Sequence, residues 1–208
     1  MNRIPCIGVT GGIACGKSTF AGFLREFGCE VFDTDDATHE LEAPGGKAIE
    51  PLVRRFGVRV LDSGGGIDRK ALGAVVFGDA EAMAALNAIV HPLVRDALAE
   101  WRSRPLPDGC SVKAALVPLL FEVGWCGSDW DAIVCVACSG PEQQRRLMGR
   151  GLTAEEARAR VASQWPVEKK AELSDIVIWN DGDLDSLRAE AQKTVAGLLE
   201  KLNERILR

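Results

Sequence analysis

The sequence predicts an α/β protein with a central parallel β-sheet, and three observations lead to this prediction. Five apolar runs of strand length are distributed along the 208 residues, at 4–9, 29–32, 112–117, 132–137 and 176–179. Segments in which apolar residues recur with helical spacing lie between these runs. A glycine-rich turn joins the first run to the first such segment. Strands that alternate with helices are typical of a parallel sheet.

The first two runs enclose a short helix. After the run at 4–9 in the sequence, apolar side chains recur at i, i+3, i+4 and i+7, at Phe20, Phe23, Leu24 and Phe27. Gly28 is a natural end for this helix. The run at 29–32 then predicts a second strand, which ends in the acidic stretch "DTDD" at 33–36.

A long segment with few strand signals follows, at about 37–105. Its only strand-like stretch is "VRVL" at 58–61. We expect this segment to be mostly helical and to lie over the sheet edge as an insertion on the substrate side.

Two short helices are predicted after the fourth apolar run, at 132–137, in the sequence. Pro141 opens the first, which is expected to carry Arg145, Arg146 and Arg150 on it, and Gly151 ends it. Thr153 and Glu156 form a capping box for the second helix. Two short helices joined by a glycine are suited to move as a lid. The last helix, from 184 to about 207, repeats leucine and alanine on one face and is interpreted as a packing element.

Composition excludes several classes of protein. Apolar residues make up 47% of the chain and charged residues 26%, which indicates a folded globular protein. The net charge of −5 argues against general binding to nucleic acid. The start "MNRIPCIGV" does not fit a signal peptide, and no apolar run has the length of a membrane span. We therefore expect a single cytoplasmic domain over 1–208, without nucleic-acid or membrane partners.

The seven cysteines are odd in number and scattered, unlike a disulfide framework, so we expect them to be reduced. Cys135 and Cys138 form one CxxC pair. No second pair of ligands lies nearby, whereas zinc needs about four ligands. We interpret these two residues as buried thiols of the fourth strand.

The stretch "GVTGGIACGKST" at 8–19 carries the most specific motif. Gly11, Gly16, Lys17 and Ser18 fit the phosphate-loop pattern, which lies here in the context it requires, after a strand and before a helix. Backbone N–H groups and the helix N-terminus attract phosphates, Lys17 reaches the β- and γ-phosphates, and Ser18 can bind Mg²⁺. Thr19 offers a further contact to the α-phosphate. The motif predicts a site for a nucleoside triphosphate.

The acceptor side is predicted from the ends of the strands, because ligands of parallel sheets gather outside their carboxyl ends. This rule selects Asp33, the stretch 118–122, Ser139 and Asn180 besides the phosphate loop. Asp33 is placed to accept a proton from an attacking hydroxyl, and Asp35 is its expected partner or a contact to Mg²⁺ through water. Asp36 is interpreted as the cap of the next helix.

Arg146 and Arg150, four residues apart on one expected helical face, are candidates to stabilise the transferred phosphoryl group. A solvated helix face is the alternative interpretation of both arginines.

With these residues in view, the chain resembles the dephospho-coenzyme A kinase family over nearly its whole length. The resemblance rests on "GVTGGIACGKST", "FDTDD" at 32–36, "IDRKALGAVVF" at 67–77, "LNAIVHPLV" at 86–94, "VPLLFE" at 117–122, "RLMGRGLTAEEARARVASQ" at 146–164 and "SDIVIWNDG" at 174–182. It implies a three-layer P-loop kinase fold with a central parallel sheet, a helical coenzyme A-binding insertion at 62–105 and a small helical lid at 140–166.

The resemblance also implies a reaction, in which the γ-phosphate of ATP passes to the ribose 3′-hydroxyl of dephospho-coenzyme A, with Mg²⁺. The implied catalytic residues are Asp33 as general base, Lys17, Arg146 and Arg150. The implied ATP site contains Gly11, Gly12, Ile13, Ala14, Cys15, Gly16, Lys17, Ser18 and Thr19, with Asn180 near the adenine and Ser18 on the metal. The implied acceptor site contains Asp33, Asp35, His91, Pro118, Leu119, Leu120 and Glu122, of which His91 fits a structural role equally well.

Two residues depart from the family pattern, which usually reads GGIGSGKS. Ala14 stands where a positive φ would strain alanine by about 1 kcal/mol. Cys15 places a thiol in the loop, and we expect the helix N-terminus to lower its pKa and make it oxidisable beside the phosphates.

Three other functions compete with this interpretation. "DSGG" at 62–65 formally fits a GTPase switch motif, but no Asn-Lys-x-Asp sequence follows. A nucleoside monophosphate kinase would differ in its acceptor. A non-catalytic nucleotide-binding module would need neither Asp33 nor an arginine lid. The oligomeric state stays open.

Overall fold

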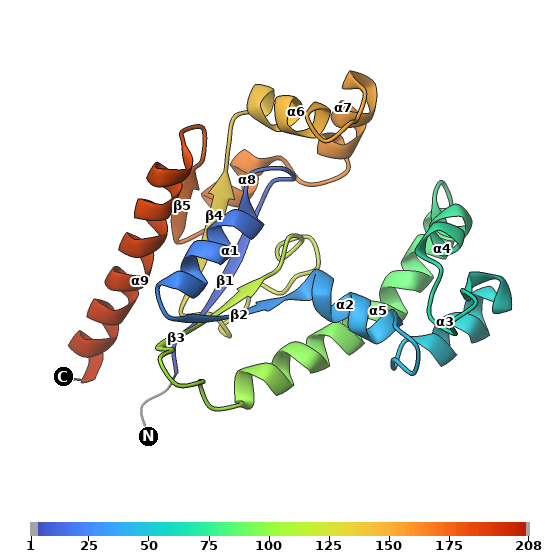
Figure 1. The fold of residues 1–208 in the computed structure, drawn as a ribbon, viewed down its shortest axis with the longest axis horizontal. Helices are drawn as coiled ribbons and strands as arrows, with labels where there is room; N and C mark the ends of the chain where they lie inside the picture. Colours follow the sequence, from blue (N-terminus) through green and yellow to red (C-terminus); the bar gives the residue numbers. More distant parts are fainter. Residues whose placement is uncertain (1–3, 207–208) are drawn as a thin grey trace. The chain divides into compact units, whose positions relative to one another are not determined.

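The computed structural model of the chain describes the backbone of residues 4–206 and the side chains of residues 4–201. Five strands form one sheet in the order β2-β3-β1-β4-β5 (Figure 1). Their bounds are Cys6–Gly11 for β1, Cys29–Asp33 for β2, Val112–Leu116 for β3, Ala132–Ala137 for β4 and Ile176–Trp179 for β5. All five predicted strands are confirmed, although β1 begins two residues later than expected.

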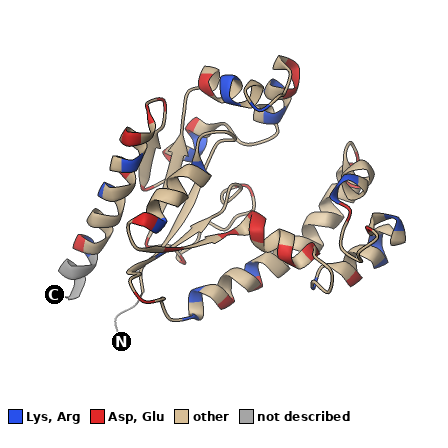
Figure 2. Ribbon diagram, in the orientation of Figure 1, with Lys and Arg blue, Asp and Glu red and all other residues tan. Residues whose placement is uncertain are grey.

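The strands β1, β3 and β4 form the buried centre of the sheet. β1 pairs in parallel with β3, where Val9 faces Leu116, and with β4, where Gly11 faces Val136. Every residue of these three strands is buried, as expected for a parallel sheet covered on both faces. Figure 2 shows that charged residues lie mainly on the helices, whereas β1 and β4 carry none. The α/β fold class is therefore confirmed.

Helix α1, Lys17–Glu26, follows the phosphate loop as predicted. It buries Phe20, Ala21 and Leu24 in the main core, where the periodic apolar face requires them. The chain turns out of the helix at Gly28, whose φ of 80° is the left-handed conformation that glycine adopts readily. Helix α9, Leu184–Ile206, packs against α1. Residue 207, at the expected end of this helix, lies outside the described residues.

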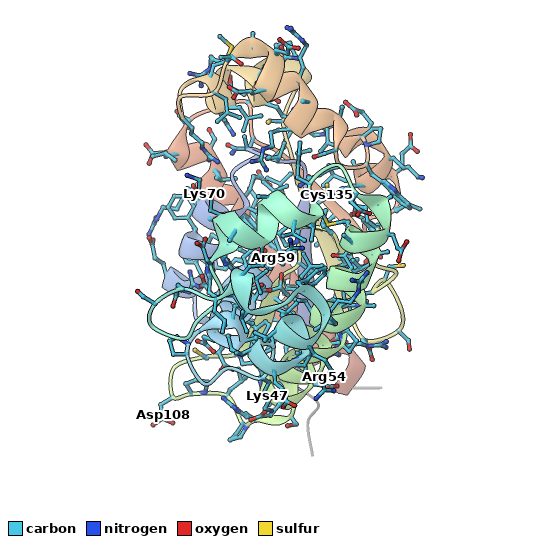
Figure 3. All side chains as sticks on the ribbon, turned by 90° about the vertical axis from the view of Figure 1, so that its right-hand side faces the viewer. Lys47, Arg54, Arg59, Lys70, Asp108 and Cys135 are labelled. Carbon is cyan, nitrogen blue, oxygen red and sulfur yellow. The ribbon has the colours of Figure 1, made fainter. Side chains whose placement is uncertain are left out.

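The segment Asp33–Arg104 forms one compact unit, and the rest of the described chain forms another. The first unit contains the helices α2, Thr34–Glu42; α3, Ile49–Phe56; η1, Val58–Val60; α4, Arg69–Val76; and α5, Ala80–Ser103. Its helical character is confirmed, and the strand-like stretch at 58–61 is mainly the short 3₁₀-helix η1. Figure 3 labels basic side chains from four parts of this unit, namely Lys47, Arg54, Arg59 and Lys70.

Three short helices connect β4 to β5, namely α6, Gly140–Met148; α7, Ala154–Ala162; and α8, Val167–Glu172. The predicted capping box of α7 is present, because Thr153 and Glu156 each accept a bond from the other's backbone N–H. Gly151, between α6 and α7, has a φ of 93°. In both α6 and α7 the acidic residues lie in the first turn and basic residues lie in the last turn.

All seven cysteines are free in the structure. Cys135, within β4 (Figure 3), and Cys138, just behind it, are fully buried, as predicted. Over the described part of the chain, no group of three or more His, Cys, Asp or Glu side chains is arranged to hold a metal ion. No helix in residues 4–206 has both the length and the hydropathy needed to cross a membrane.

Candidate active site

The phosphate loop connects β1 to α1 through two glycines that other residues could not replace without strain. Gly11 has a φ of 143°, and a Cβ built on it would lie 2.0 Å from the carbonyl oxygen of Val136. Gly16 has a φ of 94° and immediately precedes α1. A Cβ there would lie 2.3 Å from Nδ2 of Asn180. The close approach of β4 and of Asn180 therefore explains both glycines.

The side chains of the motif lie at the start of α1. Lys17 Nζ donates hydrogen bonds to the carbonyl oxygens of Gly11, at 3.1 Å, and Gly12, at 2.8 Å, so the ammonium group crosses over the loop. Ser18 and Thr19 are exposed in the first helical turn. An ammonium, two hydroxyls and the backbone N–H groups at a helix N-terminus form a setting suited to polyphosphate.

Ala14 adopts the left-handed conformation that the sequence analysis considered, with a φ of 58°. It is the one non-glycine residue with positive φ among the described residues. Its side chain is 7% exposed and packs in a small apolar cluster with Leu147 and Ala157 of α6 and α7. The alanine methyl group thus packs the phosphate loop against α6 and α7.

The thiol of Cys15 points into the core. The side chain is fully buried, and Cys138 donates a hydrogen bond to its Sγ at 3.4 Å. This bond lowers the pKa of Cys15 to about 7 against the opposing effect of burial, and Lys17 lowers it further. The low pKa was expected, but the hydrogen bond from Cys138 is its main cause.

Asn180 and Arg146 hold the loop from the side of β5 and α6. Asn180 Nδ2 donates to the carbonyl oxygen of Cys15 at 2.8 Å. Arg146 donates to the carbonyl oxygens of Ala14, at 3.2 Å, and Asn180, at 2.7 Å, and to Glu142 Oε1 at 2.6 Å. The guanidinium therefore connects three segments that are far apart in the sequence.

A cavity of about 680 Å³ opens beside these residues. Six predicted site residues line it, namely Ala14, Gly16, Thr19, Arg146, Arg150 and Asn180. Five lining residues were missed by the sequence analysis, namely Gly182, Asp183, Leu184, Asp185 and Leu187. The rule that ligands gather at the carboxyl ends of parallel strands could have found most of them, since they follow β5 and Asn180 directly in the sequence.

Arg150 was predicted on the same helical face as Arg146, and this placement is wrong. Helix α6 ends at Met148, and Arg150 lies in the turn that follows it. Gly149 and Gly151 flank the residue, and both disfavour a continuing helix. Arg150 nevertheless lines the same cavity as Arg146.

The stretch 118–122, which follows β3 in the sequence, forms a turn. The predicted acceptor residues in this turn have different environments. Leu120 is fully buried, and Leu119 is 38% exposed. The carbonyl oxygen of Pro118 accepts bonds from Thr10 Oγ1, at 3.2 Å, and Lys170 Nζ, at 2.9 Å. Glu122 pairs with Lys170 at 2.7 Å. Lys170 was not among the predicted site residues.

Asp33 is the last residue of β2 and also the N-cap of α2. Its Oδ1 accepts a bond from Asp35 N at 2.9 Å, so Asp33 has the capping position that was predicted for Asp36. Burial raises the pKa of the Asp33 carboxyl, and the neighbouring Asp35 and Asp36 raise it further, while the backbone bonds oppose them. Asp35 is exposed.

His91 lies within α5, which continues through Pro92. The imidazole is half-buried, and this burial lowers its pKa.

Comparison with known proteins agrees with this geometry. The sequence profile of the dephospho-CoA kinase family matches residues 5–186. The dephospho-CoA kinase of Chlorobaculum tepidum is 41% identical over 202 residues, which cover 95% of this chain and 97% of that protein. The dephospho-CoA kinase of Anaeromyxobacter dehalogenans is 44% identical over 193 residues, covering 92% of this chain and 91% of that protein.

Solved structures are similar to this chain as well. A crystal structure from Thermus thermophilus superposes with a TM-score of 0.79 at 38% identity and covers 94% of this chain and 98% of its own. Dephospho-CoA kinase from Campylobacter jejuni has a TM-score of 0.63 at 26% identity, with 93% and 96% covered. With a phosphate loop, an arginine-lined cavity and relatives of this similarity, the chain belongs to the dephospho-CoA kinase family.

Proposed function

We propose that the protein transfers the γ-phosphate of ATP to the ribose 3′-hydroxyl of dephospho-coenzyme A, which yields coenzyme A and ADP. The observation that carries this proposal is the convergence of the phosphate loop, Arg146 and Arg150 on one cavity. The identity of the acceptor, dephospho-coenzyme A, is inferred from the family to which the chain belongs. The reaction needs no further resident cofactor, and we expect the enzyme to work in the cytoplasm.

The donor half of the reaction falls to the phosphate loop. Lys17 neutralises the β- and γ-phosphates, and the N–H groups at the start of α1 hold their oxygens. Arg146 and Arg150 stabilise the charge that spreads over the transferred group. Asn180 keeps the Cys15 carbonyl in place and borders the adenine.

Mg²⁺ fits this donor set, although side chains supply little of its coordination. The exposed hydroxyl of Ser18 is suited to bind it, and the phosphate oxygens of ATP complete a largely oxygen-based shell. When bound, Mg²⁺ would neutralise charge that develops on the phosphates.

The acceptor half needs a base and a binding surface. Asp33, at the carboxyl end of a strand, is proposed to accept the proton of the attacking hydroxyl, with Asp35 beside it. Pro118, Leu119, Leu120 and Glu122 are proposed to border the acceptor. The insertion at 62–105, with His91, is proposed to shape the coenzyme A pocket, and 140–166 to act as the lid.

In the test, purified protein is incubated with ATP and Mg²⁺ in three parallel reactions. Each reaction contains one acceptor, either dephospho-coenzyme A, AMP or shikimate. Mass spectrometry should detect one added phosphate on dephospho-coenzyme A alone. Phosphorylated AMP would indicate a nucleoside monophosphate kinase. ADP without a phosphorylated acceptor would indicate a nucleotide switch or an ATPase.

A further inference from the structure

Lys170 places a positive charge completely inside the protein. The residue lies on α8, which packs against β1 and β4, and its side chain is 0% exposed. Its ammonium lies 2.7 Å from Glu122 Oε1 and donates to the Pro118 carbonyl oxygen at 2.9 Å. Both partners belong to the turn at 118–122 that follows β3, so one buried cation contacts the first and the last residue of that turn.

The same turn is held from two other sides. Thr10, the last residue but one of β1, donates from Oγ1 to the Pro118 oxygen at 3.2 Å. The backbone N–H of Trp165, between α7 and α8, donates to Glu122 Oε1 at 3.2 Å. The turn is therefore connected directly to the strand that leads into the phosphate loop and to the segment that returns from the lid.

Stability alone is a poor explanation for this arrangement. A buried ion pair loses hydration at both charges, and its replacement by apolar residues is often neutral or stabilising. The pair also leaves Glu122 Oε2 buried without a hydrogen-bond partner among the described residues. An unpaired buried acceptor is unfavourable and calls for a specific explanation. A directed ion pair does, however, define the orientation of a turn more narrowly than apolar packing does.

We propose that Lys170 is a positioning residue for phosphoryl transfer, which acts through Glu122 and Pro118 to hold the acceptor side of the site against the phosphate loop. The inference rests on the proposed function, because that proposal assigns the turn to the acceptor. Lys170 itself touches neither nucleotide nor acceptor. Its loss should therefore affect the use of the acceptor more than the binding of ATP.

The experiment compares Lys170→Met, Glu122→Gln and the double variant with wild type. Kinetic constants for ATP and dephospho-coenzyme A are measured beside the midpoint of urea unfolding. Lys169→Met is the matched control, since Lys169 is the exposed neighbour whose ammonium lies over the Trp165 ring. Lys170→Met should lower kcat/KM for the acceptor about tenfold or more and change the KM for ATP less than about twofold. The control should stay within about twofold of wild type.

The double variant separates positioning from stability. Lys170→Met leaves an uncompensated carboxylate in the interior, whereas the double variant removes both charges and should regain much of the lost stability. If Lys170 acts through Glu122, kcat/KM for the acceptor stays low in the double variant, and the two losses are clearly less than additive. Recovery of this parameter together with stability would reduce the pair to a structural role and overturn the proposal.

Thr10→Val provides a second variant that alters no buried charge. It removes the other donor to the Pro118 oxygen with little change in volume, and we expect kcat/KM for the acceptor to fall about threefold or more. Wild-type values for the acceptor in both Thr10→Val and Lys170→Met would overturn the proposal. If the wild-type protein did not phosphorylate dephospho-coenzyme A, the proposed function itself would be disproved. Failure of the proposed function is therefore distinguishable from failure of the role proposed for Lys170.

Discussion

The Sγ atoms of Cys15 and Cys138 lie 3.4 Å apart, although 123 residues separate them in the sequence. Cys138 donates the hydrogen bond, which lowers the pKa of Cys15 to about 7 and raises that of Cys138. A thiol with a lowered pKa at the base of the phosphate loop thus faces a second thiol.

Hydrogen peroxide should join these two residues. In the balanced reaction both thiols lose a hydrogen, one S–S bond forms and the peroxide is reduced to two waters. Since the thiolate reacts, the rate should rise with pH up to about 7 and level off above it. Peptide mass spectrometry should find the Cys15–Cys138 pair, and activity should fall and return with dithiothreitol. Cys138→Ser should resist this loss, and an irreversible loss in wild type would contradict the prediction.

Replacement of Asp33 by asparagine separates its two roles. Asparagine caps helices about as well as aspartate, so α2 should keep its start, whereas the amide cannot accept a proton. We expect kcat to fall about a hundredfold while ATP affinity, measured by titration calorimetry, hardly changes. Turnover near the wild-type value would remove Asp33 from the role of base.

The raised pKa of Asp33 also predicts a pH dependence. The base works only when it is ionised, so activity should be lost as the pH falls through the pKa of this group. Because burial raises that pKa, the acid limb of kcat/KM should lie above the usual range of an aspartate. The limb should be absent in the residual activity of Asp33→Asn.

Local patterns were sufficient to predict the strands, the phosphate loop and the capping box of α7. In each case the physical cause lies within a few residues, as in the Thr153–Glu156 pair. The contacts of Cys15 with Cys138 and of Lys170 with Glu122 depend on which segments the fold brings together, and nothing in either local sequence specifies the partner. The end of α6 was misplaced because the arginine spacing outweighed the two glycines that flank Arg150.

Ala14→Gly tests how the left-handed alanine is tolerated. Glycine would relieve about 1–2 kcal/mol of backbone strain. It would also lose about 0.8 kcal/mol of methyl burial against α6 and α7 and add about 0.4–1 kcal/mol of entropy to the unfolded chain. These effects nearly cancel, so the free energy of unfolding in urea should change by less than about 1 kcal/mol.

Ala14→Val is the contrasting variant, because a β-branched residue at a φ of 58° adds strain and crowds Leu147. It should be destabilised by about 2 kcal/mol or more. A comparable loss in Ala14→Gly would mean that the methyl contact with α6 and α7 outweighs the strain.

Asn180→Asp should damage the phosphate loop more than removal of the side chain does. The buried amide donates to the Cys15 carbonyl, and a carboxylate would place an acceptor against that oxygen at 2.8 Å. Loss of the bond and the remaining repulsion should lower stability by about 1–3 kcal/mol and ATP affinity about tenfold or more. Asn180→Ala loses the donor without the repulsion, so its affinity should lie between those of wild type and Asn180→Asp. Equal affinities for all three proteins would show that this hydrogen bond does not shape the nucleotide site.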